Sequence, residues 1–230
     1  MRRGWEAQAR NWAEFARVPG HDPTHEDINL PALLRLLPEP AGLALDLGCG
    51  EGRLGRALQP LGYRVAGVDA APTMVRLAVS HQTREPAVLA DAAALPFRDE
   101  TFGLVVAYMS LHDMDRMPEA VAEAGRVLAP QGRLVMAIPH PVSSAGSFQS
   151  RAADAPFTVA GSYLDPGPAD SVVERDGVRL TFHSEHRPLE SYSRALEAAG
   201  LLTEAIREPR AAAGRWRRIP LILQLRAVKP

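Results

Sequence analysis

One stretch constrains the fold of this chain more than any other, the run Leu-Ala-Leu-Asp-Leu-Gly-Cys-Gly-Glu-Gly over residues 43–52. Its apolar start predicts a buried strand over 43–47, and residues 53–58 then open a helix. The alternating glycines between them let the backbone approach a ligand closely, and the helix N-terminus offers free N–H groups to an anion. A strand, a glycine loop and a helix in this order predict a nucleotide-cofactor site.

The identity of the nucleotide is open to two interpretations. The glycines between residues 50 and 55 satisfy the dinucleotide pattern G-x-G-x-x-G, and Asp69 ends the next expected strand. A dinucleotide site needs its glycines directly after the strand, where Gly48 stands here, and Asp46 puts a negative charge beside the place of a pyrophosphate. That carboxylate favours a cofactor that carries an ammonium and a sulfonium. A nicotinamide-dependent reductase stays an alternative, although its lysine-dependent form is excluded because Lys229 is the only lysine.

Strands and helices alternate from residue 43 to residue 138, which predicts a doubly wound α/β domain with right-handed crossovers and a parallel sheet. The expected strands are 43–47, 63–68, 87–89, 103–108 and 133–138, and the expected helices are 53–59, 71–80 and 117–128. Ligands of such sheets lie beyond the C-terminal strand ends, at the switch point of strand order. The loop after the first strand therefore marks the site.

The flanking regions complete a single domain over residues 1–230. Residues 1–40 predict a helical lead-in, with an aromatic helix face from Trp5 to Ala16 and a second short helix over 29–37. Residues 188–199 predict a further helix. The expected strands 201–208 and 221–228 form an antiparallel hairpin at the sheet edge, with the arginine-rich loop 210–218 at its tip.

Residues 139–187 break the alternation of strands and helices. Turn sequences fill this excursion, and short runs at 157–159 and 178–182 are suited to β-ribbons. Because the excursion leaves the fifth strand at its C-terminal end, we predict that it forms a lid over the acceptor site. The acceptor contacts expected from it are Phe148, Phe157, Tyr163 and Arg187.

Composition limits the partners of this chain. A net charge of −1 gives no long-range attraction to nucleic acid or to an anionic membrane. The single Cys49 excludes an internal disulfide and a cysteine zinc cluster, and we predict no metal. No apolar run approaches the roughly 18 residues of a membrane span, and the N-terminal residues lead into no signal-type core. We expect a cytoplasmic monomer or homodimer that acts on a small molecule.

Acidic residues at two further strand ends suit a nucleoside. Asp69 can accept hydrogen bonds from both ribose hydroxyls, although the N-cap of a helix beginning at Pro72 explains an aspartate there too. Asp91 follows the third strand, where its carboxylate can accept from the adenine amine. The remaining adenine contacts are expected from Ala70, Met74, Ala92 and Ala93.

Two sequence blocks resemble a known family. The pattern Asp-x-Gly-x-Gly-x-Gly over residues 46–52 resembles the first motif of class I S-adenosylmethionine-dependent methyltransferases. The pattern Asp-Ala-x-x-Leu-Pro-Phe-x-Asp-x-x-Phe over 91–102, followed by an apolar strand and Leu-His, is similar to the central block of their small-molecule, type 11 members. Residues 126–134 resemble the turn into their fifth strand. Gly103 and Gln131 depart from the pattern, at positions away from the expected cofactor contacts.

The resemblance covers about residues 41–138 and implies a Rossmann-like, seven-stranded sheet that is mostly parallel, with an antiparallel C-terminal hairpin strand. It implies S-adenosylmethionine as methyl donor and a small-molecule acceptor. A non-catalytic protein that binds S-adenosylmethionine stays an alternative. The cofactor contacts that it adds to those of the nucleoside are Asp46, Gly48, Cys49, Gly50 and Met109.

Methyl transfer from a sulfonium is an in-line displacement, so the enzyme must above all orient the two reactants. Some acceptors also need a base that removes a proton. His112 leaves the fourth strand beside the expected methyl position, and Asp113 is placed to orient its ring. These two are the predicted catalytic residues. Other titratable candidates on loops at this edge are His140, His183 and His186, and Trp12, Phe15 and Arg17 are candidates to cover the methionine end.

Overall fold

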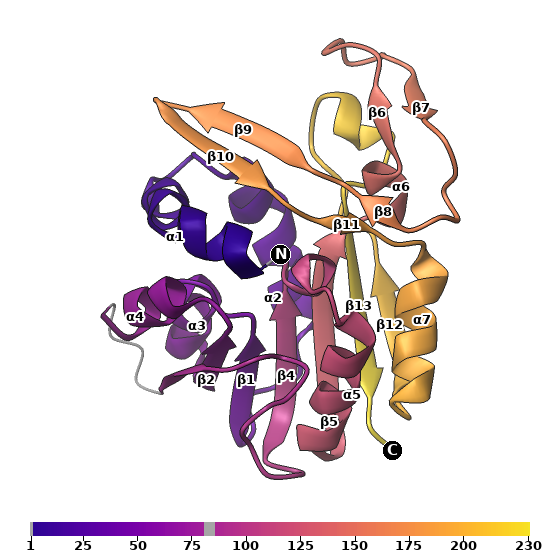
Figure 1. The fold of residues 1–230 in the computed structure, drawn as a ribbon. Coiled ribbons are helices and arrows are strands. Elements are labelled where there is room, and N and C mark those ends of the chain that lie inside the picture. Colours follow the sequence, from indigo (N-terminus) through magenta and orange to yellow (C-terminus); the bar gives the residue numbers. More distant parts are fainter. Residues whose placement is uncertain (1, 81–85) are drawn as a thin grey trace.

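The structure is a computed structural model that describes residues 2–80 and 86–230. Its centre is a seven-stranded sheet in the order β12-β13-β5-β4-β1-β2-β3 (Figure 1). β13 is antiparallel to both of its neighbours, and the other pairs are parallel. The predicted fold class is confirmed. The strands are β1 (Leu43–Leu47), β2 (Arg64–Asp69), β3 (Ala87–Leu89), β4 (Phe102–Tyr108), β5 (Leu128–Pro139), β12 (Leu202–Arg207) and β13 (Ile222–Val228).

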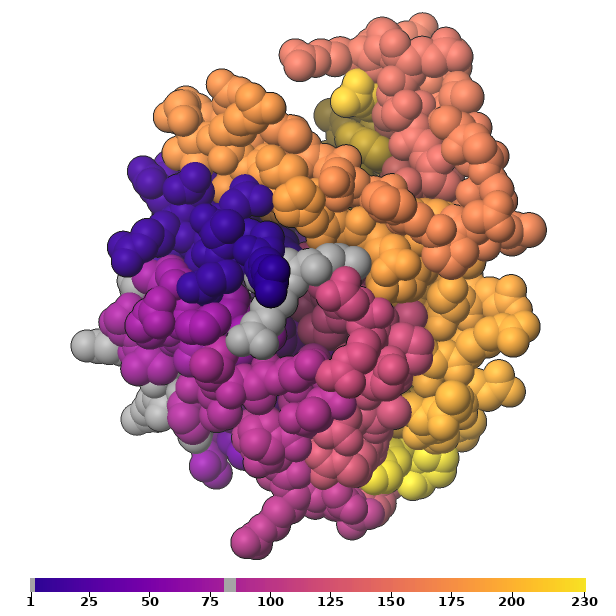
Figure 2. All heavy atoms as spheres, in the orientation of Figure 1, coloured from indigo at the N-terminus to yellow at the C-terminus, as the bar shows by residue number. Residues whose placement is uncertain are grey.

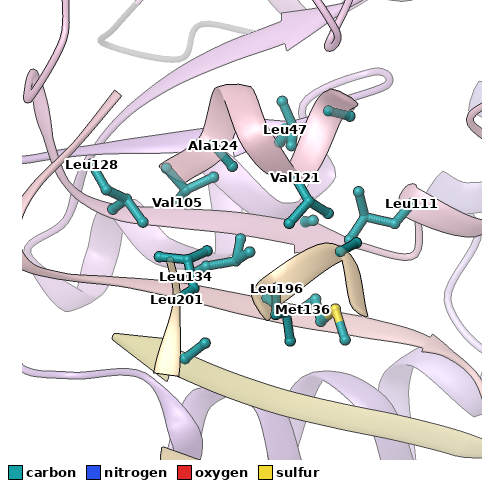
Figure 3. Packing of buried hydrophobic residues seen from close by; sticks show 14 of the residues in the cluster. Leu47, Val105, Leu111, Val121, Ala124, Leu128, Leu134, Met136, Leu196 and Leu201 are labelled. Carbon is teal, nitrogen blue, oxygen red and sulfur yellow. The ribbon is translucent and has the colours of Figure 1, made fainter. Parts of the chain in front are cut away.

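Helices cover both faces of this sheet. They are α2 (Leu30–Leu36), α3 (Arg53–Leu58), α4 (Pro72–Ser80), α5 (Met117–Val127) and α7 (Leu189–Ala198). Successive side chains of a strand point to opposite faces, so Leu45 packs in one apolar layer with α5 and α7, whereas Ala44 packs in the other with α2 and α3. Figure 3 shows the first layer, where Val121 and Leu196 lie against the sheet.

β5 begins at Leu128 rather than at the predicted residue 133, and the difference has a local cause. Leu128 pairs with Phe102 at the start of β4, but the register then shifts before Leu104. The extra residues form an irregularity in which Gln131 takes a φ of 63°. The turn that resembles the family pattern therefore lies inside a strand.

The excursion over residues 139–187 divides into two arms. It contains α6 (Pro141–Ser144), β6 (Gly146–Phe148), β7 (Phe157–Val159), β8 (Gly167–Pro168), β9 (Ser171–Arg175), β10 (Val178–Phe182) and β11 (Glu185–His186). The two predicted strand runs are present, but each pairs with a neighbouring strand, β7 with β6 and β10 with β9. Figure 1 shows the β9–β10 hairpin at the upper left, beside the N-terminal helix, and the β6–β7 hairpin at the upper right.

The N-terminal helix α1 (Arg2–Arg17) lies against α4 and β10. The Gln8 side chain clamps the backbone of Thr181, because its Oε1 accepts from the Thr181 N–H at 2.7 Å and its Nε2 donates to the Thr181 carbonyl at 2.5 Å. Farther along, Arg175 donates to the carbonyls of Gly20 and His21, both at 2.6 Å. We call α1 and the β9–β10 hairpin together the roof, and Figure 2 shows their atoms in contact.

Two other elements link α1 to the sheet and to the site. The π-helix η1 (Thr24–Asn29) joins α1 to α2, and the 3₁₀ turn η3 (Leu111–Asp113) follows β4.

Within the described residues, no helix combines the length and apolar character needed to span a membrane.

Gly48 tests how tightly the loops after β1 and β4 pack. It has φ +79°, and a Cβ there would lie 2.5 Å from the Ser110 Cβ, whereas Gly20 has φ +80° and open space around it. Gly48→Ala and Gly20→Ala should share a backbone cost of about 1–2 kcal/mol in the free energy of unfolding. Gly48→Ala should lose about 1–3 kcal/mol more from overpacking. Urea unfolding measures both, and equal losses would show that the loops have room to separate.

Candidate functional site

A cavity of about 600 Å³ opens at the C-terminal ends of the parallel strands, beneath the roof. In the sheet, β1 lies between β2 and β4. The strand order runs outward from β1 in both directions, so the cavity lies at the switch point of strand order. The cavity brings together every residue that we predicted to bind the cofactor or to carry catalysis. These lining residues are Asp46, Gly48, Cys49, Gly50, Asp69, Ala70, Met74, Asp91, Ala92, Ala93, Met109, His112 and Asp113.

Asp46 is the most unusual charge in the cavity. Its side chain is 2% exposed, and its Oδ2 atom has no hydrogen-bond partner in the described structure. Burial, helped by the charges of Asp69 and Glu51, raises the pKa of Asp46 from 3.8 to about 8. A buried carboxyl group with an unused oxygen is a site for a cation, so Asp46 fits the positive end of S-adenosylmethionine.

The glycine loop leaves backbone space for a ligand. Gly50 has φ +54°, and a Cβ at this position would meet nothing within 4 Å, so the loop is open toward the cavity. The N–H groups of Gly48 and Cys49 donate to the Val68 carbonyl at 2.8 and 2.9 Å, which ties the loop to β2. Behind the loop, the buried Glu51 forms a bidentate pair with Arg56 at 2.6 and 2.8 Å, a support that the sequence did not reveal.

Asp69 holds the glycine loop and caps the next helix. Its Oδ2 accepts from the Gly50 N–H at 2.9 Å and its Oδ1 accepts from the Ala71 N–H at 2.8 Å. Burial raises the pKa of this carboxyl group. The bond to Ala71 is of the kind expected of a helix cap, and the same side chain lines the cavity, as a ribose-binding carboxylate must.

Asp91 lies at a more exposed part of the cavity. Its Oδ1 accepts from the Ala93 N–H at 2.9 Å, and its Oδ2 pairs with Arg116 at 2.6 Å. This turn keeps the backbone of residues 91–93 against the cavity.

His112 and Asp113 lie on the buried turn η3. The His112 Nε2 atom is 3.4 Å from the Asp113 Oδ1 atom, and the His112 Nδ1 atom has no partner in the described structure. Burial lowers the pKa of His112, and the Asp113 charge opposes this shift. The imidazole is therefore held in its neutral, proton-accepting form next to a carboxylate.

Both parts of the roof bind Asp113. The Ser184 hydroxyl, just after β10, donates to its Oδ1 atom at 2.8 Å, and the Trp5 side chain of α1 forms a second hydrogen bond with it. Desolvation raises the pKa of Asp113, which His112 and these bonds offset in part.

The four residues that we predicted for the acceptor do not belong to the described lining of the cavity. Phe148 and Phe157 pack against Trp216, on the arginine-rich loop, with ring centroids 4.9 and 6.4 Å away. Tyr163 accepts from the Leu189 N–H at 3.1 Å, at the start of α7. This placement does not support the acceptor prediction, because the part of the excursion in the described lining is Pro139, the β9–β10 arm and Ser184.

Arg187 has a supporting position instead. It is 7% exposed, and its guanidinium donates to the carbonyls of Leu111 and His112 at 3.4 Å and of Met114 at 2.7 Å. It also pairs with Glu185. Arg187 therefore holds the turn that carries His112, from the side away from the cavity.

The roof, the segment after α1 and the end of β4 contribute the lining residues that sequence reasoning missed or left as packing. Trp12 and Phe15, noted as a cover for the methionine end, line the cavity, whereas Arg17 pairs with the buried Glu51 at 3.4 Å. The other candidate histidines lie elsewhere: His140 bonds to Glu208, His183 to Asp170, and His186 to Ser144. Lining residues without an earlier role include Trp5, His21, His25, Tyr108, Ser171, Val173, Arg175, Phe182 and Ser184.

Comparison with known proteins agrees with this geometry. A family model described as a methyltransferase domain matches residues 45–136. The human mitochondrial protein named arginine-hydroxylase NDUFAF5 is 32% identical over 145 residues, which are 59% of this chain and 41% of that protein. The malonyl-[acyl-carrier protein] O-methyltransferase of Enterobacter lignolyticus is 31% identical over 126 residues, 53% of this chain and 50% of that enzyme. The chain thus spans half or less of these curated relatives.

A solved structure extends the likeness to most of the chain. The S-adenosylmethionine-dependent methyltransferase from Mesorhizobium loti superposes with a TM-score of 0.70 at 23% identity, covering 86% of this chain and 96% of its own. The fold is that of the class I methyltransferases, and residues 45–136 match the methyltransferase-domain model. The resemblance predicted from the sequence is confirmed. The family model and the solved structure both point to methyltransferases, and the solved one depends on S-adenosylmethionine.

Asp46→Asn separates the electrostatic role of Asp46 from its shape. Because the pKa of Asp46 is raised from 3.8 to about 8, the folded protein keeps a proton that the unfolded chain releases. The contribution of Asp46 to the free energy of unfolding is therefore largest below about pH 4, and it is lost as the pH rises toward 8. Relative to the parent, the asparagine variant should gain free energy of unfolding across this range, as measured by urea unfolding at pH 4, 6 and 8.

Donor binding should change in the opposite direction. Calorimetry should show S-adenosylmethionine binding at least about 10-fold more weakly to Asp46→Asn, since a charge-assisted contact contributes about 1.5–3 kcal/mol. Parent binding should also release a proton below pH 8. A variant that matches the parent in both measurements would assign Asp46 to packing alone.

Proposed function

We propose that this chain transfers a methyl group from S-adenosylmethionine to a small-molecule acceptor. The observation that carries the proposal is the buried Asp46 carboxyl, whose Oδ2 atom has no partner among the described residues, beside a glycine loop that is open to the cavity. The adjoining Asp69 and Asp91 supply acidic groups for the ribose and adenine. The family model over this region supports the same activity.

The proposed cofactor contacts follow the cavity from one strand end to the next. Asp46 faces the positive methionine end, with backbone contacts from Gly48, Cys49 and Gly50. Asp69 accepts from the ribose, and Asp91 from the adenine amine. The adenine and the reacting end are flanked by Ala70, Met74, Ala92, Ala93 and Met109.

When bound, S-adenosylmethionine supplies an electrophilic methyl carbon on a positive sulfur, which leaves as a neutral thioether. The residues of this chain hold the acceptor in line, exclude water and receive its proton. The roof supports the exclusion of water, since its aromatic side chains Trp5, Trp12 and Phe182 all line the cavity. His112, neutral and beside Asp113, is the proposed proton acceptor. In place of the four acceptor residues named from the sequence, we propose those of the β9–β10 arm, chiefly Val173, Phe182 and Ser184.

The expectations of a cytoplasmic location and of a monomer or homodimer stay predictions. The division of the chain into one domain with a helical lead-in and a lid also stays a prediction. Within the lid, the β9–β10 arm is the part that we propose for the acceptor site.

Calorimetric titration with S-adenosylmethionine and with NADH, side by side, tests the cofactor. We expect the first to bind and the second to give no saturable heat, because a pyrophosphate would meet the Asp46 carboxyl. Binding of NADH alone would return the chain to the reductase interpretation. Binding of S-adenosylmethionine without turnover, across a screen of metabolites with methyl-labelled donor, would favour a non-catalytic binding protein.

His112→Ala tests the proton acceptor. If the acceptor is a hydroxyl or a protonated amine, the variant should transfer methyl groups about 10²–10⁴-fold more slowly, with donor affinity retained. The rate profile should also lose its acidic limb, which lies below pH 6.5 in the parent because burial lowers the pKa of His112. The matched control is His183→Ala, since His183 is exposed outside the cavity lining. Near-parental rates in His112→Ala would leave catalysis to orientation alone.

A further inference from the structure

A second histidine of the cavity forms a polar pair with a tyrosine. The His25 Nδ1 atom is 2.8 Å from the Tyr108 hydroxyl oxygen, and the two rings meet edge to face with centroids 5.6 Å apart. Both side chains line the cavity. Tyr108 is the last residue of β4, immediately before Met109, so the pair lies on the same strand end as the turn that carries His112.

The pair is held in place from behind. His25 belongs to the π-helix η1, a rare backbone form that often occurs at functional sites. The same helix is fixed to the sheet by Gln224 of β13, whose Nε2 donates to the backbone and side-chain oxygens of Asn29, both at 2.8 Å. The position of His25 relative to β4 is thus set before any ligand enters.

Both members of the pair are neutral. Burial lowers the pKa of His25 to about 4, with a further contribution from Arg53, and burial raises the pKa of Tyr108 far above its ordinary value. Two of the neighbouring charges are matched to each other, since Arg53 pairs with Asp22 at 2.8 Å. The pair itself therefore supplies no counter-charge to a charged acceptor.

The remaining hydrogen-bonding capacity of the pair suits a hydroxyl group. If the phenol donates to the imidazole, its oxygen can still accept, and if the imidazole donates, the phenol O–H can still donate. A hydroxyl both donates and accepts, so it fits either arrangement. A carboxylate only accepts and an ammonium only donates, so each fits one arrangement and adds an unmatched charge.

Aromatic side chains form much of the roof side of the cavity. Phe182 and Phe15 each lie against Trp12, with ring centroids 5.7 and 6.0 Å apart, and all three line the cavity with Val173. Aromatic surfaces with a few placed polar groups bind ligands that have an apolar body and a hydrogen-bonding group.

We propose that the acceptor is an uncharged aromatic compound whose hydroxyl group hydrogen-bonds to the His25–Tyr108 pair while its ring lies against the aromatic roof. The inference rests on the proposed function for the reaction, but the binding site itself does not. Tyr108 and His25 are thus specificity-determining residues for the acceptor.

Ligand-observed NMR titrations of the full chain, with and without S-adenosylhomocysteine, test this site with three probes of one shape. The probes are 4-methylphenol, its methyl ether 4-methylanisole and the anion 4-methylbenzoate. The phenol should bind about 3–10-fold more tightly than either of the others, the ratio expected for one net hydrogen bond. Tyr108→Phe keeps the ring and should weaken phenol binding by that factor, and it should weaken ether binding less, because an ether can only accept a hydrogen bond.

Two further variants complete the design. Tyr63→Phe is the matched control, because the Tyr63 hydroxyl donates to the Pro38 carbonyl and does not belong to the described lining. It should change neither affinity. His25→Phe should reproduce the loss seen in Tyr108→Phe, with melting temperatures recorded for all variants.

Benzoate binding as tight as phenol binding, no phenol binding, or a phenol-to-ether ratio that survives both substitutions would overturn the proposal. Phenol binding that depends on Tyr108 in a protein that does not bind S-adenosylhomocysteine would support the acceptor site and overturn the proposed methyl donor.

Discussion

The close approach of the loops after β1 and β4 is the constraint on which the rest of the site depends. At Gly48 the absence of a side chain lets Ser110 pack directly on the backbone, and the Ser110 hydroxyl donates to the Leu47 carbonyl at 2.5 Å. These loops leave adjacent strands at the switch point, so one presents the glycine loop and the other presents His112 to the same cavity. Separation of the two loops would separate the proposed donor site from the proposed proton acceptor.

The same region contains acidic side chains whose burial is electrostatically unfavourable. Asp46 lies in the middle of three acidic side chains, since Asp69 and Glu51 both raise its pKa. Arg56 neutralises Glu51, and backbone N–H groups bind Asp69, but Asp46 keeps an oxygen without a partner among the described residues. Buried polar groups without partners destabilise a fold, so this one is explained best by a positive ligand that completes it.

The fold was predictable to within a few residues because its signals are local. Apolar runs, turn residues and helix periodicity gave the bounds of β1 and β3 without error, and the strand-end rule then placed Asp46, Asp69, Asp91 and His112 in one cavity. The irregular start of β5 was not predictable, because it depends on how Leu128 meets Phe102 across the sheet.

The roof could not be predicted for the same reason. Gln8 binds Thr181 and Arg175 binds Gly20 across more than 150 positions of sequence. The sequence around these residues contains no pattern that predicts the partner. The aromatic residues Phe148 and Phe157 had the composition expected of a lid, yet Trp216 of a distant loop packs against them instead.

These long-range contacts converge on one side chain. Asp113 binds Trp5 from α1 and Ser184 from the end of the β9–β10 hairpin, and it lies beside His112. If either part of the roof moved away, it would remove a hydrogen bond from the carboxylate beside the imidazole. Arg187 holds the opposite side of the same turn through three backbone carbonyls, so the turn itself is fixed while its carboxylate depends on the roof. The hydrogen bonds that hold Asp113 beside the proposed proton acceptor therefore depend on the roof that covers the cavity.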